Sequence, residues 1–114
     1  MNNPDSCKPT CCPKMEQALQ LLSKKWAGLI IYSLLSGPKR YKEIADFLPN
    51  ISDRMLSERF RDLEEAGIVA RHVYPEVPVR IEYELTAKGK ALEPILRELQ
   101  QWADEWAQGT PEST

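Results

Sequence analysis

Three cysteines lie close together near the start of the 114-residue chain, at Cys7, Cys11 and Cys12. Cys12 directly precedes Pro13, and proline favours the first position of a helix, so Cys12 is predicted to cap the N-terminus of a helix. The free backbone N–H groups there, the helix dipole and the nearby Lys14 favour the thiolate, which is the form that attacks electrophiles and oxidants. Cys12 is therefore the candidate redox-sensing residue.

Other roles for the thiols stay open. Cys12 is alternatively a small apolar residue packed at the start of a helix, because free cysteine is often buried. The three thiolates can also hold a soft metal ion, although their spacing is not that of a zinc ribbon. A small thiol peroxidase or reductase is disfavoured because the chain has no Cys-x-x-Cys pair, no phosphate-binding glycine loop and a single histidine, His72. We expect no enzyme activity, no metal and no cofactor.

A second group of candidate residues lies on a helix predicted between Ser52, a suitable N-cap, and Gly67, a terminator. Apolar residues recur on one side of this helix at helical spacing, and charged residues recur on the other. Arginine can bind guanine, a serine hydroxyl can bind a phosphate, and glutamate can accept from cytosine. An ordinary solvated helix face with i,i+4 ion pairs is the alternative. The residues predicted to face DNA are Ser52, Arg54, Ser57, Glu58 and Arg61.

A β-hairpin is predicted directly after this helix. Its strands are Val69–Tyr74 and Arg80–Leu85, which are rich in β-branched and aromatic residues, and a proline-bounded tip at 75–79 joins them. Charged side chains on both sides of the tip would reach DNA, or would simply prevent edge-to-edge pairing of the sheet. The candidate residues on this hairpin, which we call the wing, are Arg71, His72 and Arg80.

The remaining pattern is helical. Helices are predicted from Pro13 to about Ser23, from Trp26 to a stop at Gly37-Pro38, and over Tyr41–Leu48. Thr86 is predicted to cap one long final helix that reaches about Ala107 and bends at Pro94. Lys39 and Arg40, just before the short helix, are predicted to contact phosphate. A short helix, an exposed helix and a hairpin in this order are typical of a winged helix-turn-helix.

The charge and composition of the chain limit which of these predicted functions are possible. The chain has 15 basic and 17 acidic side chains, a net charge of −2 and a pI near 5.5. This weighs against nucleic-acid binding unless the charges are segregated, and it keeps a protein-interaction module open. No apolar run is long enough to cross a bilayer, so a cytoplasmic protein with no membrane partner is expected. We expect a flexible arm at 1–11, one domain at 12–108 and a disordered tail at 109–114.

Several long segments resemble the HxlR-type family of bacterial winged-helix transcription regulators, which are related to the MarR group. The matching segments are CPKMEQALQLLSKKWAGLII, SGPKRYKEIADFLPNISDRMLSERFRDLEEAGIV, YPEVPVRIEYELTAKGKAL and the closing helix with Trp102. The resemblance implies an α+β, mostly α fold: a winged helix-turn-helix with a β-hairpin wing and N- and C-terminal dimerisation helices. It also implies double-stranded operator DNA as a partner and a repressor more often than an activator. The alternative is a winged-helix regulator without redox sensing that responds to a metal or a small ligand.

The resemblance further implies a homodimer held by the terminal helices. The residues expected in that interface are Met15, Leu19, Leu22, Leu92, Leu96, Leu99, Trp102 and Trp106. The start of the first helix resembles the thiol-based branch of the family, which senses quinones, other electrophiles or oxidants. Some relatives carry partner cysteines near the C-terminus, and this chain has none. A resolving thiol must then be Cys12 of the other subunit, Cys7, Cys11 or a small cellular thiol, unless alkylation alone is the signal. Adjacent Cys11 and Cys12 are a poor pair because a vicinal disulfide strains the backbone.

Overall fold

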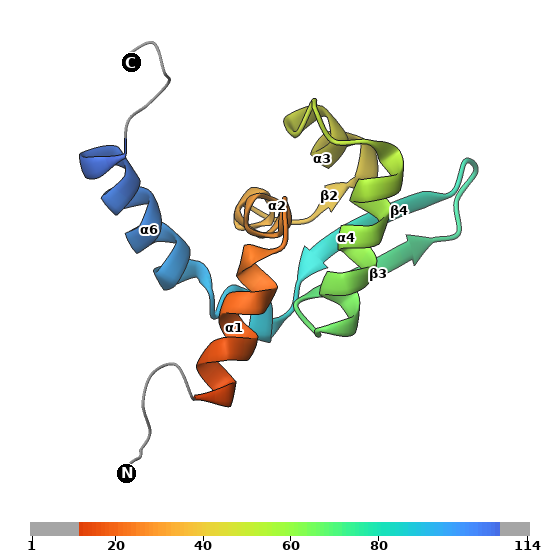
Figure 1. The fold of residues 1–114 in the computed structure, drawn as a ribbon. Helices are drawn as coiled ribbons and strands as arrows, with labels where there is room; N and C mark the ends of the chain where they lie inside the picture. The colour runs from red at the N-terminus through yellow and green to blue at the C-terminus, as the bar shows by residue number, and fades with distance from the viewer. Residues whose placement is uncertain (1–11, 108–114) are drawn as a thin grey trace.

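The computed structural model describes residues 12–107. Figure 1 shows the helices nearest the chain ends, α1 and α6, on one side of the molecule and the β3–β4 hairpin on the other. The fold is mostly helical with one small antiparallel sheet, which confirms the predicted α+β winged helix-turn-helix. The elements in chain order are α1 (Pro13–Ser23), α2 (Ala27–Leu34), β2 (Lys39–Arg40), α3 (Tyr41–Phe47), α4 (Asp53–Glu65), β3 (Val69–Tyr74), β4 (Arg80–Leu85), α5 (Ala87–Lys90) and α6 (Glu93–Trp106).

The sheet has the strand order β2-β4-β3, and both pairings are antiparallel. Strands β3 and β4 have the bounds that the sequence predicted, with Tyr74 paired to Arg80 next to the tip. Strand β2 was not predicted. Its two residues have no periodicity of their own, and they become a strand because Arg40 pairs with Glu82 on β4. The sequence had predicted only that they lie just before the short helix.

The core is made by α2, α3, α4 and the sheet. Helix α4 buries Leu56, Phe60 and Leu63, the residues that recur at helical spacing. The ring of Phe60 stacks on the ring of Tyr83 from β4, with 3.8 Å between the ring centres. This contact fixes one face of α4 against the sheet, so the opposite face is left for solvent or a partner.

The ends of α4 are set by the residues that the sequence indicated. The Ser52 hydroxyl accepts a hydrogen bond from the Met55 backbone N–H at 3.1 Å, which is a standard N-cap. At the other end Gly67 has a φ of 76°, a left-handed conformation that suits glycine. Both boundary predictions are confirmed.

The prediction of one long, bent final helix was wrong. Thr86 caps only the short helix α5, accepting from the Gly89 backbone N–H at 3.1 Å. A second helix, α6, then begins at Glu93, and Pro94 lies in its first turn rather than in the middle of a helix. Proline lacks a backbone N–H, which costs nothing in a first turn, where that group has no helical partner.

No helix in the described part of the chain is long and apolar enough to cross a membrane.

Candidate DNA-binding surface and cysteine site

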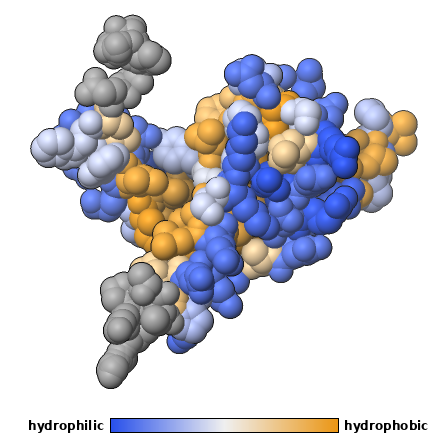
Figure 2. Space-filling view, viewed as in Figure 1, coloured by the Kyte–Doolittle hydropathy of each residue, from blue (hydrophilic) through white to orange (hydrophobic). Residues whose placement is uncertain are grey.

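The exposed face of α4 carries the predicted DNA-reading residues. Arg54, Ser57 and Arg61 are exposed, as is the cap residue Ser52, because the opposite face is buried in the core. Glu58 is half-buried and pairs with Arg54 across one helical turn, with 3.5 Å between Nε and Oε2. Figure 2 shows hydrophilic side chains gathered over this part of the molecule. The face therefore presents cations and hydroxyls on a rigid helix.

Helix α3 holds the start of α4 in place through Tyr41. The Tyr41 hydroxyl donates to the Asp53 backbone carbonyl at 3.1 Å and lies 3.4 Å from the Ser57 hydroxyl. The start of α3 is itself fixed, since the Glu43 carboxylate accepts from the Arg40 backbone N–H at 2.7 Å. This role of Tyr41 could not be predicted from the sequence, because no local pattern links it to a partner twelve residues away.

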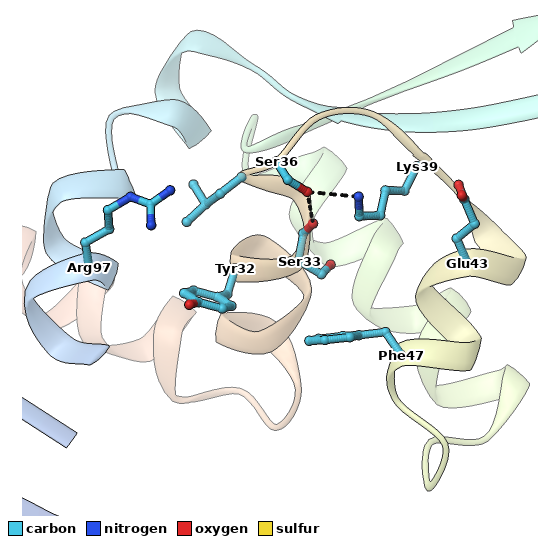
Figure 3. Close-up of a pocket in the computed structure, with 8 residues that line it drawn as sticks. Tyr32, Ser33, Ser36, Lys39, Glu43, Phe47 and Arg97 are labelled. Carbon is cyan, nitrogen blue, oxygen red and sulfur yellow. Dashed lines mark hydrogen bonds between the residues drawn. The ribbon is translucent and has the colours of Figure 1, made fainter. Parts of the chain in front are cut away.

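The two predicted phosphate contacts at β2 differ in their surroundings. Arg40 is exposed. Lys39 is half-buried and donates to the Ser36 hydroxyl at 2.9 Å. It lines a cleft of about 460 Å³ between α2, α3 and α6, together with Tyr32 and Arg97. Figure 3 shows these side chains around the opening of the cleft.

Arg80, the predicted wing cation, is held by its neighbours. Its guanidinium pairs with the carboxylates of Glu76 at 3.0 Å and Glu82 at 2.6 Å, and it lies 4.1 Å from the centre of the Tyr74 ring. The hydrogen bond from Arg80 lowers the pKa of Glu76 below its ordinary value, and the pKa of Arg80 is raised in return. The charge of Arg80 is thus matched within the protomer.

The other two wing candidates also differ. His72 lies 2.9 Å from the Glu84 carboxylate, across the hairpin. Arg71 is exposed and forms no ion pair within residues 12–107, and the same holds for Arg40 and Arg61. Among residues 12–107, these three arginines and Lys39, which donates to the Ser36 hydroxyl, are the cations of the predicted surface that have no carboxylate partner.

Arg59 has a structural role that the sequence analysis did not assign. Its side chain donates to the Lys25 backbone carbonyl at 2.7 Å and to the Asp62 carboxylate at 2.8 Å. It therefore ties α4 to the segment between α1 and α2. The i,i+3 spacing of Arg59 and Asp62 was a signal for the ion pair, but not for the bond to Lys25.

Cys12 is the N-cap of α1, as predicted. Its backbone carbonyl accepts from the Glu16 N–H at 3.0 Å, while its side chain makes no capping hydrogen bond. The thiol is free and half-buried. Lys14 is exposed, whereas Cys7 and Cys11 lie outside the described residues. Between residues 12 and 107 no three cysteine, histidine or carboxylate side chains gather as a metal site would require.

The residues predicted for a dimer interface fall into two groups. Leu96 is buried in the protomer core, and Leu22 and Leu92 pack against that core. The remainder are each more than half exposed and lie on α1 and α6: Met15, Leu19, Leu99, Trp102 and Trp106. Figure 2 shows hydrophobic side chains gathered between these two helices. We use the name terminal-helix patch for the five exposed residues.

The sequence model of the HxlR-like helix-turn-helix family matches residues 21–111. The chain belongs to the HxlR family. Members of this family are DNA-binding transcription regulators and not enzymes, so the chain is a transcription regulator, as its sequence predicted.

Three known proteins are similar to this chain over most of its length. An uncharacterized HTH-type regulator of Bacillus subtilis, YvaP, is 57% identical over 95 residues, which cover 83% of this chain and 88% of the relative. YodB of the same organism is 52% identical over 99 residues, covering 87% and 88%. The solved reduced form of YodB superimposes with a TM-score of 0.77 over 87% of this chain and 98% of its own. YodB has also been solved in diamide-treated and quinone-bound forms.

The third relative is the redox regulator HypR in its oxidized form. It is 39% identical, with a TM-score of 0.80 over 86% of this chain and 100% of its own. The fold of this HxlR-family chain is therefore shared with regulators whose solved states include reduced, oxidized and quinone-bound forms.

Proposed function

We propose that this HxlR-family regulator is a homodimeric repressor, and that oxidants or electrophiles such as quinones or diamide release it from operator DNA by modifying Cys12. Its relatives support the redox part, since YodB has been solved in diamide-treated and quinone-bound forms and HypR is a redox regulator. The cytoplasm is the compartment in which such a thiol is kept reduced and available.

The observation that carries the proposal is the place of Cys12 on α1. Cys12, Met15 and Leu19 are three and four residues apart, so they lie along one side of the helix. Met15 and Leu19 are apolar side chains that α1 exposes to solvent. An exposed apolar helix face of this kind is typical of a protein–protein interface. Cys12 therefore extends the terminal-helix patch at its N-terminal end.

A second subunit covering this patch would set the distance between two α4 helices. Each α4 would enter a major groove, with Arg61 and Arg54 on bases or phosphates and Arg40 and Arg71 on the flanking backbone. Half-sites one helical turn apart tolerate little change in that distance. A group added to Cys12 would alter the packing of the terminal helices, and so weaken the binding of both α4 helices at once.

The chemistry of the modification follows from the thiolate. With a quinone, the thiolate sulfur adds to a ring carbon, so that a C–S bond forms and a ring C=C π bond opens. One quinone oxygen takes up a proton from water and the other receives the proton of the substituted carbon, which gives a hydroquinone thioether. With diamide, two thiols lose two electrons and two protons and become a disulfide, while the diamide N=N bond is reduced to a hydrazine. The second thiol is Cys12 of the other subunit, Cys7, Cys11 or a small cellular thiol.

The test measures binding of the reduced, full-length protein to a duplex from the region upstream of its own gene, by fluorescence anisotropy. Benzoquinone or diamide should weaken binding by wild type at least tenfold and leave Cys12→Ser unchanged. Cys7→Ser and Cys11→Ser are the matched controls for alkylation and should respond as wild type does. If Cys12→Ser is still released by benzoquinone, Cys12 is not the sensor.

The repressor assignment has its own test. In transcription reconstituted from the upstream region, the reduced protein should lower transcript yield and benzoquinone should restore it. A transcript yield that rises with added reduced protein would make the regulator an activator instead.

A small organic anion is a second candidate effector, favoured by the cleft between α2, α3 and α6. Lys39 and Arg97 come from elements far apart in sequence, and both line this cleft beside the rings of Tyr32 and Phe47. The Glu43 carboxylate lines it too, and Arg97 also pairs with Glu93 at 2.7 Å, so the net positive charge of the cleft is small. Its volume of about 460 Å³ suits a small ligand. Benzoate is a simple probe: it should raise the melting temperature of wild type but not that of Arg97→Gln. No shift for wild type would argue against this effector.

A further inference from the structure

The tip of the β3–β4 hairpin exposes apolar side chains. Val77, between Pro75 and Pro78, is fully exposed, and Val79, between Pro78 and the start of β4, is 61% exposed. Figure 1 shows the hairpin extending beyond α4, and Figure 2 shows the hydrophobic tip next to the hydrophilic surface of α4. We use the name wing tip for residues 75–79.

We propose that the wing tip enters the DNA minor groove as an uncharged apolar wedge, and that Arg80 is a positioning residue for the tip rather than a phosphate contact. The proposal rests on the proposed function, since it names how that DNA-binding surface reads the sequence next to its half-site.

The contacts of Arg80 support the positioning role. Its guanidinium joins three places: Glu76 inside the tip, Glu82 on β4 and the Tyr74 ring at the end of β3. Turning Arg80 towards a phosphate would break two ion pairs and leave both carboxylates facing the DNA backbone. The change would therefore weaken the electrostatic attraction between the hairpin and DNA.

The charged side chains beside the wing tip nearly cancel one another, which lets the tip approach DNA. Two carboxylates, Glu76 and Glu82, surround the single cation Arg80, and a net negative tip would be repelled by DNA. Arg40 reduces that repulsion, because its positive charge lies opposite Glu82 in the β2–β4 register and lowers the pKa of Glu76, although it forms no ion pair with either carboxylate among the described residues. The tip can therefore approach DNA without carrying a positive charge of its own.

The position of the hairpin relative to α4 indicates that the wing tip would enter the minor groove. Grooves alternate along the duplex, so a hairpin that projects past a helix in the major groove meets the neighbouring minor groove. That groove is about 6 Å wide, which excludes a helix but admits a narrow hairpin end. Apolar side chains are known to act as wedges in minor grooves. Valine side chains at an exposed tip fit this use.

An apolar wedge predicts a specific base preference. A G·C pair places the guanine N2 amino group in the minor groove, whereas A·T does not. Val77 and Val79 offer no acceptor to that amino group, so its hydrogen bond to water would be lost. The wing tip should therefore favour A·T pairs at the flank of each half-site.

The experiment compares three duplexes that share a footprinted half-site from the upstream region and differ only in the flanking pairs: A·T, inosine·C and G·C. Inosine·C keeps the major-groove pattern of G·C but lacks the N2 amino group. Wild type should bind the A·T and inosine·C duplexes about tenfold more tightly than the G·C duplex. The double variant Val77→Ser, Val79→Ser should bind all three with similar affinity.

A salt titration distinguishes a positioning role for Arg80 from direct binding to phosphate. Arg80→Gln should abolish the flank preference and keep the wild-type slope of log affinity against log salt. Arg61→Gln, the matched control, should keep the preference and lower the slope by about 0.9 for each phosphate that the variant no longer neutralises.

Three results would overturn the proposal while leaving DNA binding intact. These are equal binding of the three duplexes by wild type, a flank preference retained by the double valine variant, and a slope lowered by Arg80→Gln as much as by Arg61→Gln. Failure of wild type to bind any upstream duplex would overturn the proposed function itself, and the wing-tip proposal with it.

Discussion

The Tyr41 hydroxyl donates to the Asp53 backbone carbonyl across 3.1 Å, which links the first residue of α3 to the first residue of α4. This bond spans the turn of the helix-turn-helix. It orients the end of α4 that carries Ser52 and Arg54, the part of a recognition helix that meets base edges first.

Tyr41→Phe removes this hydroxyl and keeps the ring. We expect a small loss in the free energy of unfolding, about 0.5–1.5 kcal/mol, because one partly exposed hydrogen bond is removed. Affinity for the upstream duplex should fall by a larger factor than this instability explains, because the start of α4 is then less well oriented. Urea denaturation and anisotropy measure the two quantities. Unchanged affinity would show that the bond does not orient α4.

Gly89 offers a sharp test of the packing between α5 and the hairpin. A Cβ at this position would overlap the Ile68 backbone oxygen and lie only 3.0 Å from a Leu85 methyl carbon. Gly89→Ala should therefore destabilise the fold by about 1–3 kcal/mol, the usual cost of overpacking. Melting temperature and urea denaturation measure the loss.

Gly28→Ala is the matched control, because a Cβ at Gly28 meets no atom within 4 Å and alanine favours the helix. It should leave stability unchanged or raise it by up to about 1 kcal/mol. Equal destabilisation by both substitutions would contradict the close approach of α5 to Ile68.

The pH dependence of stability should report on Tyr83. Burial raises the pKa of Tyr83 above its ordinary value, although the nearby Arg71 acts in the opposite direction. Above about pH 10 the unfolded chain releases this phenol proton while the folded chain retains it. The stability linked to Tyr83 is therefore fully present below the unfolded pKa and is lost as pH rises through the folded pKa.

Urea denaturation between pH 8 and pH 11 checks this sign. Tyr83→Phe keeps the stacked ring beside Phe60 and should lose stability less steeply at the alkaline end than wild type does. Lysine titration affects both proteins alike and cancels in the comparison. Parallel curves for the two proteins would mean that the phenol of Tyr83 titrates as it does in the unfolded chain.

Local signals predicted much of this fold. The strands β3 and β4 were predicted with the correct bounds because alternation, β-branching and the prolines at 75 and 78 all act within a few residues. The caps at Ser52 and Gly67 were predicted for the same reason. Features that depend on distant partners were missed. Strand β2 exists only through its pairing with β4, and the close approach of Gly89 to the Ile68 backbone oxygen joins residues about twenty positions apart.

The candidate site shows the same division. Helical periodicity placed Arg54, Ser57 and Arg61 on the outer face of α4, which the structure confirms as exposed. Periodicity alone did not separate Leu96, which is buried in the protomer, from Leu99, which is exposed on the same helix. It also did not show that Arg80 is held by two carboxylates, since Glu76 and Glu82 approach it only once the hairpin has formed.

The exposed stripe of α6 gives a direct test of dimerisation. Ile95, Leu99, Trp102 and Trp106 follow one another at spacings of four, three and four residues, and all are more than half exposed. A buried, unpaired carboxylate in that stripe is costly. Leu99→Glu should therefore give a monomer at micromolar concentration and reduce affinity for a two-half-site duplex at least tenfold. Sedimentation equilibrium and anisotropy measure these effects.

Gln101→Glu is the matched control, because it adds the same charge on the same helix away from the stripe. It should remain a dimer and bind the duplex nearly as wild type does. Single half-site binding should be equally weak for all three proteins, since each α4 keeps its own contacts. A dimeric Leu99→Glu protein would place the interface elsewhere, and it would remove the route by which Cys12 is proposed to act on α4.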